Sequence, residues 1–237
     1  MPAPTNLVTL NAANIIGLLY ETESSDNPSN LTQFSTPSTG ANSTYAFGPL
    51  QVDVGGNKQS AGQFLLNNGF TQTQVTELES TTSVSSSELS TLNTELQAIP
   101  TATMAQFQES MVGGYITQLN NVLQTIAGVN PAAATAIENS TDDQLALVDY
   151  MNQYNGISTD VTANPNGMLA YLEGNEVTTA GAPNGLQLSS NSITPADIAA
   201  FVSTTHYSVN HPTGAANRAD RLQTGLSQND SGTAVLR

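Results

Sequence analysis

Two acidic residues near the end of the first apolar segment differ in the surroundings that the sequence predicts for them. Residues 11–23 predict a helix with Asn11 as its N-cap. Its apolar face is formed by Ala12, Ile15, Ile16 and Leu19. At 100° per residue from Ile15, this face covers roughly 0° to 100°, with Glu23 at roughly 80° and Glu21 at roughly 240°. We therefore expect Glu23 to face the interior and Glu21 to be solvated.

The predicted position of Glu23 suits proton transfer. Burial and the negative end of the helix dipole both raise the pKa of a carboxyl group. A general acid that works near neutral pH needs a raised pKa. The alternative is that the helix frays at this end and the Glu23 side chain turns to solvent.

Two motifs are similar to those of a known superfamily. Residues 23–28 read Glu-Ser-Ser-Asp-Asn-Pro, and residues 45–53 read Tyr-Ala-Phe-Gly-Pro-Leu-Gln-Val-Asp. Together they resemble the lysozyme superfamily, in particular lytic transglycosylases and goose-type lysozymes. In those families a helix ends in Glu-Ser, and a small β element with a Gly-x-Met/Leu-Gln-Val motif follows. The resemblance covers only about residues 15–57.

The resemblance implies roles for individual residues. Glu23 matches the catalytic acid, and Gly48 and Gln51 match the Gly-x-x-Gln element. Asp53 matches the goose-type Asp and would be a base or a group that positions water. Gln51 and Tyr45 would contact the glycan in the cleft.

A weaker similarity lies farther along the chain. Residues 150–156 read Tyr-Met-Asn-Gln-Tyr-Asn-Gly, which is similar to the Tyr-Asn-Ala-Gly segment that lines the transglycosylase cleft. This implies that Tyr150 and Tyr154 contact substrate, and the alternative is that both pack between helices.

The departures from the family pattern bear on the mechanism. Residues 29–44 contain no acidic residue, so a second goose-type Asp has no counterpart. An inverting hydrolase needs two carboxyl groups about 6.5–9.5 Å apart, with a water molecule between them. If Asp53 does not face the cleft, the single-acid route of a lytic transglycosylase is the better interpretation.

The pattern along the chain predicts a mainly α, lysozyme-like domain with a small β element near residues 44–56. We expect a single domain over residues 1–237. It would hold the catalytic motifs in 11–57, a helical body in 60–156, and loop-rich segments with C-terminal helices in 157–226.

The Ser/Thr-rich centre of residues 71–99 predicts a break between two helices. Thr194 and Pro195 predict a capped helix start, and the tail after Gly225 is expected to fray.

Composition excludes several classes of partner. The chain has 237 residues, no Cys, four Lys plus Arg against nineteen Asp plus Glu, and a formal charge of −15. It has no basic patch, so nucleic acid and anionic membrane surfaces are not expected partners. It also has no apolar run of membrane-spanning length and no signal-peptide pattern in residues 1–10.

Other chemistry is weakly supported. His206 and His211 have no carboxylate cluster beside them in the sequence, so no metal site is predicted, and no motif indicates a cofactor. Arg218 and Arg221, nearly the only cations, are expected to pair with internal carboxylates.

The sequence therefore predicts a secreted or periplasmic glycosidase that cuts β-1,4 links of peptidoglycan by general acid catalysis, as a muramidase or a lytic transglycosylase. The charge of −15 would repel an anionic cell wall at low salt. The enzyme would therefore work in acid, or on a neutral or cationic glycan in the manner of a chitinase or chitosanase. Alternatively, the chain is a non-catalytic structural or glycan-binding protein on the same fold. Biased amino-acid usage would explain the acidic composition equally well.

Overall fold

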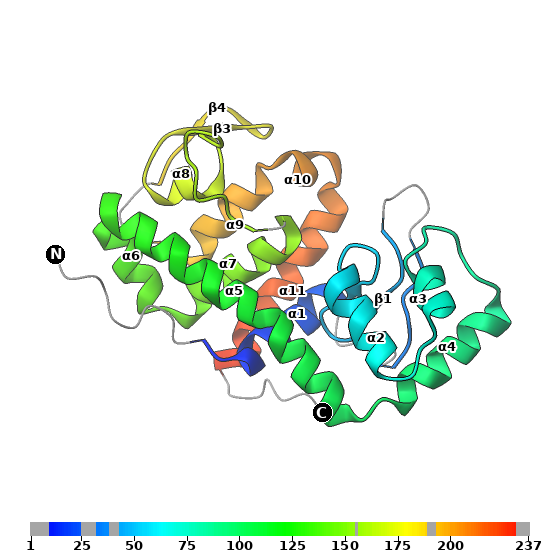
Figure 1. Cartoon of the computed structure of the whole chain (residues 1–237). Coiled ribbons are helices and arrows are strands. Elements are labelled where there is room, and N and C mark those ends of the chain that lie inside the picture. The colour runs from blue at the N-terminus through cyan, green and yellow to red at the C-terminus, as the bar shows by residue number, and fades with distance from the viewer. Residues whose placement is uncertain (1–9, 25–31, 38–42, 155, 189–192, 231–237) are drawn as a thin grey trace. The chain divides into compact units, whose positions relative to one another are not determined.

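A computed structural model describes residues 10–24, 32–37, 43–154, 156–188 and 193–230. These residues are mainly helical, with two small antiparallel sheets of two strands each (Figure 1). The prediction of a mainly α fold with a small β element near residues 44–56 is confirmed. Residues 25–28 of the Glu-Ser-Ser-Asp-Asn-Pro motif lie outside the described residues. No described helix is both long and apolar enough to cross a membrane.

The chain divides into two compact units. Unit 1 comprises Met1–Leu18 and Val112–Arg237, and unit 2 comprises Leu19–Met111. The division points fall inside helices α1 (Ala12–Ser24) and α5 (Thr101–Val129). The expectation of one domain over residues 1–237 did not anticipate this division. The first point, between Leu18 and Leu19, has no linker composition, and the second, between Met111 and Val112, lies beside Gly113 and Gly114 but inside the continuous helix α5.

Unit 2 begins with the last turns of α1 and contains the predicted β element. Its strands are β1 (Ala46–Phe47) and β2 (Val52–Asp53), paired antiparallel with Ala46 opposite Asp53 and Phe47 opposite Val52. The helices that follow are η2 (Lys58–Gly62, a π-helix), α2 (Gln63–Asn67), α3 (Gln72–Leu78) and α4 (Ser86–Ala98). The predicted break in residues 71–99 is confirmed by the gap between α3 and α4.

Aromatic rings dominate the core of unit 2. Phe64 and Phe107 stack with ring centroids 4.1 Å apart, and Phe47 stacks on Phe107 at 5.6 Å. Phe34 meets Phe47 edge to face at 5.7 Å and Phe70 at 5.9 Å. Such pairs add to the free energy of burial, so the cluster ties the hairpin to α2 and to the start of α5.

Unit 1 holds the remaining elements. They are the rest of α5, α6 (Pro131–Glu138), α7 (Thr141–Tyr154), α8 (Met168–Leu172), β3 (Val177–Thr179), β4 (Ala182–Leu186), α9 (Pro195–Ser203), α10 (His206–Asn210) and α11 (Pro212–Asp230). The predicted start at Thr194 is confirmed: its side chain accepts from Asp197 N while the Asp197 carboxylate accepts from Thr194 N. The predicted pairing of Arg218 is also confirmed, because its guanidinium contacts Asp149 at 2.8 Å.

The C-terminal part of the chain differs from expectation in two places. Residues 157–226 were expected to hold loop-rich segments and C-terminal helices, and the β3–β4 hairpin within them was not predicted. Pro183 fits in β4 because this strand has a partner on one side only. The tail was expected to fray after Gly225, yet α11 continues to Asp230, and residues 231–237 lie outside the described residues. Leu226, in this last part of the helix, is buried.

Candidate functional site

The two acidic residues of α1 occupy the reverse of the predicted environments. Glu21 is buried, with 8% of its surface exposed, whereas Glu23 on the last turn is partly exposed. Their exposures are reversed because the buried face of α1 is wider than the apolar stripe that the sequence shows. Leu18, at roughly 300° on the helical wheel, is only 2% exposed, so the buried arc extends past the apolar stripe toward Glu21. Glu23 is therefore the more accessible carboxylate of the pair.

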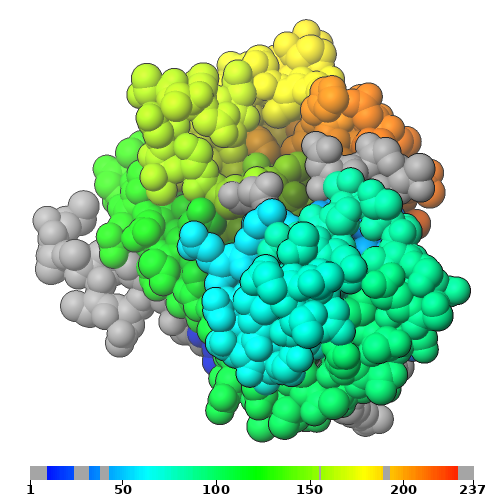
Figure 2. All heavy atoms as spheres, turned by 45° about the vertical axis from the view of Figure 1, so that its right-hand side comes forward, coloured from blue at the N-terminus to red at the C-terminus, as the bar shows by residue number. Residues whose placement is uncertain are grey.

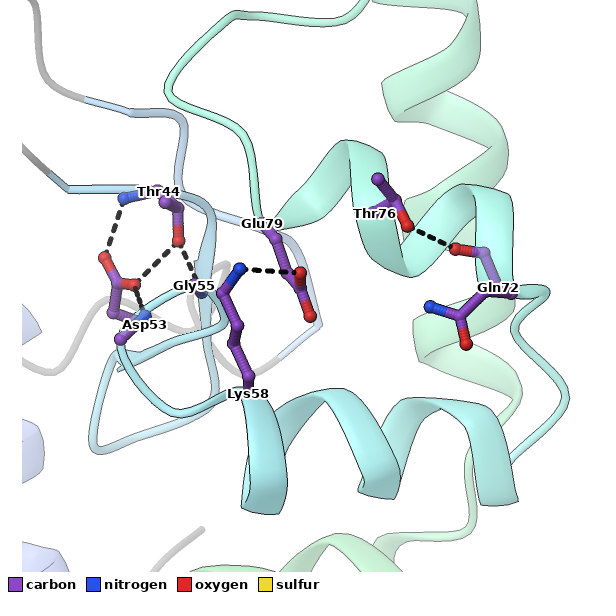
Figure 3. A network of polar contacts seen from close by, with 8 residues as sticks. Thr44, Asp53, Gly55, Lys58, Gln72, Thr76 and Glu79 are labelled. Carbon is purple, nitrogen blue, oxygen red and sulfur yellow. Dashed lines mark hydrogen bonds and ion pairs between the residues drawn. The ribbon is translucent and has the colours of Figure 1, made fainter.

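Asp53 is held by a network at the end of the hairpin (Figure 3). Its Oδ2 accepts from Thr44 N at 2.7 Å, and its Oδ1 accepts from Thr44 Oγ1 and from Gly56 N, both at 2.7 Å. Thr44 Oγ1 in turn accepts from Gly55 N at 2.7 Å. Bonds of this kind to a carboxylate are among the stronger ones in proteins. Asp53 thus fixes the turn after β2, and both of its oxygens are engaged in doing so.

The Gly-x-x-Gln element closes the hairpin. Gly48 and Gln51 both have positive φ angles, 73° and 47°. Gln51 N and Nε2 donate to the Gly48 carbonyl at 3.0 and 2.9 Å, and Gln51 Oε1 accepts from Ser35 Oγ. A Cβ on Gly48 would lie 2.5 Å from Nε2 of Gln108, so the position requires glycine. The amide of Gln51 is used within unit 2, which gives this sequence pattern a structural role.

Tyr45 does not reach the surface. Its side chain is 0% exposed, and its hydroxyl oxygen accepts from Val84 N at 2.9 Å. The predicted cleft contact through Tyr45 is therefore wrong. Its alternation with Phe47 places it on the core side of the hairpin, where a Tyr satisfies its hydroxyl with a buried backbone donor.

Tyr150 and Tyr154 belong to unit 1, whereas Glu23, Gln51 and Asp53 belong to unit 2. The two Tyr rings stack at 4.6 Å, and Tyr150 also meets Phe201 at 6.0 Å. The hydroxyl groups of Tyr154 and Thr205 lie 2.8 Å apart. Burial raises the pKa of Tyr150 to about 12. These contacts support the alternative of helix packing for both residues.

Unit 2 also carries an open hollow of about 370 Å³ that the sequence analysis missed. Eight of its ten lining residues are uncharged and polar, and the other two are Phe64 and Phe107. The amides of Gln59, Gln63 and Asn67 recur every four residues along η2 and α2 (cyan in Figure 2), which reach the surface. That spacing places them on one helical face, and it is the signal from which the hollow could have been predicted.

The hollow has the chemistry of a site for a neutral, hydroxyl-rich ligand. Primary amides both donate and accept hydrogen bonds, and aromatic rings provide an apolar surface for C–H groups. None of the residues that line it is charged.

The residues that the structure describes do not support a metal-binding site. They contain no group of three or more His, Cys, Asp or Glu residues that could hold an ion. His206 and His211 are exposed side chains of unit 1. The His206 ring contacts the Asn210 amide, and the His211 ring lies 4.9 Å from that of Tyr207.

Comparison of the chain with protein-family models, with curated proteins and with solved structures gives no match. The resemblance to the lysozyme superfamily therefore stays a prediction that rests on the motifs in residues 23–53.

Proposed function

We propose that unit 2 cleaves β-1,4 links of a glycan, with Glu23 as the proton donor and the reaction following the lytic-transglycosylase route. The observation that supports this route is the state of Asp53, whose two oxygens already accept three hydrogen bonds. A carboxylate engaged in this way is poorly suited to activate water. A mechanism that needs one carboxyl group then fits better than one that needs two.

In this mechanism Glu23 acts twice. Its carboxyl group first gives a proton to the oxygen of the scissile link, so that the leaving sugar departs as an alcohol. The resulting carboxylate then takes the proton of the C6 hydroxyl, whose oxygen bonds to C1 and closes a 1,6-anhydro ring. The proton that Glu23 gave is thereby restored and no water is consumed.

The surface of unit 2 supports a glycan without dense negative charge. The hollow beside Phe64 and Phe107 offers amides and rings but no cation, and the chain as a whole carries −15. We therefore propose two substrate types, peptidoglycan at acidic pH or a chitin-like polymer. Either substrate would place the protein in a secreted or periplasmic setting.

A non-catalytic glycan-binding protein is the second candidate. The hollow favours it, because amides and aromatic rings bind sugars without any need for an acid.

Digestion of purified peptidoglycan and of chitosan across pH 3–8, with products read by mass spectrometry, tests the proposal. We expect products with 1,6-anhydro ends from the parent chain. Glu23→Gln should lower turnover at least about 100-fold, since general acid catalysis contributes about 10²–10⁴. The matched control is Glu109→Gln, an exposed carboxylate of unit 2, which should leave turnover unchanged.

The outcomes separate the candidates. Full turnover by Glu23→Gln would overturn the assignment of the acid. Products with ordinary reducing ends, lost in a folded Asp53→Asn variant, would restore Asp53 as a base. Binding to either glycan without turnover by any variant would favour the binding protein.

A further inference from the structure

The chain contains four Asn-Gly pairs, and this dipeptide is able to react with itself. The backbone nitrogen of the glycine attacks Cγ of the preceding side chain, because glycine has no Cβ to hinder the approach and adopts φ angles that other residues avoid. The pairs begin at Asn68, Asn155, Asn166 and Asn184. Asn155 lies outside the described residues, so the structure compares the other three.

Two of these three side chains are held by hydrogen bonds. Asn68 Nδ2 donates to the Phe64 carbonyl at 2.8 Å. Asn166 Oδ1 accepts from Thr178 N at 2.9 Å and from Thr178 Oγ1 at 3.1 Å. Such bonds fix the amide group and must break before Cγ can turn toward the glycine nitrogen. The pairs at Asn68 and Asn166 are therefore protected.

Asn184 differs from both. Its side chain is exposed and has no hydrogen bond to any residue that the structure describes. It lies in β4, on the hairpin drawn in yellow at the top of Figure 1. The β4 partners of Val177 and Thr179 are Leu186 and Ala182. One residue thus lies between the paired positions of β3 and three lie between those of β4. The surplus residues form a bulge in which the ladder does not hold the backbone.

The fold requires the glycine of this pair. Gly185 has a φ angle of 100°, which favours glycine, and a Cβ at this position would collide with Oε1 of Glu176. The hairpin therefore keeps a reactive glycine directly after an asparagine whose side chain nothing holds.

We infer that Asn184 is a site of spontaneous modification, at which the exposed Asn-Gly pair of the β3–β4 bulge converts to aspartate and isoaspartate. Gly185 N bonds to Asn184 Cγ, the bond from Cγ to the amide nitrogen breaks, and the glycine N–H proton leaves with that nitrogen as ammonia. Water then opens the five-membered succinimide at either carbonyl carbon. Both products add one negative charge, and isoaspartate also adds a methylene group to the main chain. The reaction depends on neither Glu23 nor a glycan.

The first experiment ages the folded full chain in mildly alkaline buffer and follows each pair by peptide mapping with mass spectrometry. Conversion raises the mass of a peptide by about 1 Da, since a hydroxyl replaces the amino group. We expect Asn184 to convert at least about tenfold faster than Asn166, whose two hydrogen bonds must first break.

The same chain unfolded in guanidinium chloride is the matched control. The three pairs should there convert at similar rates, because no hydrogen bond protects any of them. Conversion of Asn68 or Asn166 ahead of Asn184 in the folded chain would overturn the proposal. So would a folded chain in which Asn184 stays intact.

The second experiment uses two variants. Asn184→Gln lengthens the side chain, so the five-membered ring cannot form. It should abolish conversion at this position and leave the rates at Asn68 and Asn166 unchanged. Thr178→Val removes one of the two donors to Asn166 and should raise the rate there about fivefold. Circular dichroism checks that both variants fold. An unchanged rate at Asn166 in folded Thr178→Val would show that hydrogen bonds do not protect these pairs, and the inference would fail.

Discussion

The two units fill their interiors in different ways. Unit 2 packs rings, since it holds five of the six Phe residues of the chain: Phe34, Phe47, Phe64, Phe70 and Phe107. A half-buried carboxylate of this unit, Asp53, is held by two backbone N–H groups and one hydroxyl group. Unit 1 packs aliphatic side chains and alanines, leaves an apolar pocket between its helices, and holds Asp149 by a cation.

The difference shows how a chain of high negative charge satisfies its buried and half-buried carboxylates. With four Lys plus Arg in 237 residues, most acidic residues cannot have a cation. The Asp53 carboxylate instead accepts hydrogen bonds from Thr44 and from Gly56 N in the turn after β2. Asp143 in unit 1 is less well satisfied: it is 2% exposed and its Oδ1 accepts no hydrogen bond from the described residues. Burial raises its pKa to about 6, although a hydrogen bond with the Ser140 side chain acts in the opposite direction. Unit 1 should therefore be the more sensitive of the two to changes of charge.

The largest effect is expected from the ion pair of unit 1. Arg218→Met leaves the Asp149 carboxylate buried without its cation and should lower the free energy of unfolding by about 3–5 kcal/mol. Denaturant unfolding followed by circular dichroism measures the loss. The double variant Arg218→Met with Asp149→Leu removes both charges and should recover most of it.

The ion pair of unit 2 is the control for this comparison. Lys58 contacts Glu79 at 3.1 Å, and the Lys58 side chain is 61% exposed (Figure 3). Lys58→Met should cost less than about 1 kcal/mol, because solvent screens an exposed pair. Equal losses for Arg218→Met and Lys58→Met would contradict the distinction between the units.

The second-largest effect is expected from the titration of Asp143, which makes the stability of the fold depend on pH. Because the pKa of Asp143 in the folded chain, about 6, exceeds the ordinary value of 3.8, this group binds more protons in the folded chain than in the unfolded chain between about pH 4 and pH 6. The contribution of Asp143 to the free energy of unfolding should therefore fall as pH rises through this range. The difference in pKa corresponds to about 3 kcal/mol.

Two variants isolate this contribution. Asp143→Asn should unfold at a higher temperature than the parent at pH 7 and show a flatter profile from pH 4 to pH 7. Asp220→Asn, an exposed carboxylate of α11, should keep the profile of the parent. Equal profiles for the parent and Asp143→Asn from pH 4 to pH 7 would show that Asp143 does not titrate in this way. A parent chain that becomes more stable from pH 4 to pH 6 would argue against adaptation to acid.

The smallest effect is expected from the hydrogen bonds to Asp53 in unit 2, a network in which no cation takes part. Thr44→Val keeps the shape of the side chain but removes one donor to Asp53 and the acceptor of Gly55 N. We expect a loss of about 2 kcal/mol, since a hydrogen bond to a charged group contributes about 1.5–3 kcal/mol. Thr76→Val removes an exposed hydroxyl that donates to the Gln72 carbonyl (Figure 3) and should change stability by less than about 0.5 kcal/mol. Similar losses for both variants would mean that the Asp53 network adds nothing to the stability of unit 2.

Local signals in the sequence predicted local structure well. Asn11 and Thr194 begin their helices as expected, because capping depends on residues three positions apart. The small β element near residues 44–56 and the Ser/Thr-rich break before α4 were likewise predicted from short segments. Arg218 was expected to find an internal carboxylate, although the sequence could not identify Asp149 as its partner.

The candidate site was predicted less completely, because exposure depends on what packs against each face. The helical wheel could not show that Leu18 widens the buried face of α1 and encloses Glu21. The family motif includes Tyr45 but does not tell whether its hydroxyl meets a sugar or Val84. The amides of Gln59, Gln63 and Asn67 were visible in the sequence, yet their proximity to Phe107 was not.

The sequence by itself determined the helical class, the caps, the place of the first hairpin and a formal charge of −15. These properties follow from spacing along the chain and from composition. Only the tertiary structure decided that Glu23 is more accessible than Glu21, that Asp53 is held by three donors, and that the side chain of Asn184 has no hydrogen bond to the described residues while that of Asn166 accepts two. Each of these depends on contacts between residues far apart in the chain, and no local pattern encodes the free energy of such contacts.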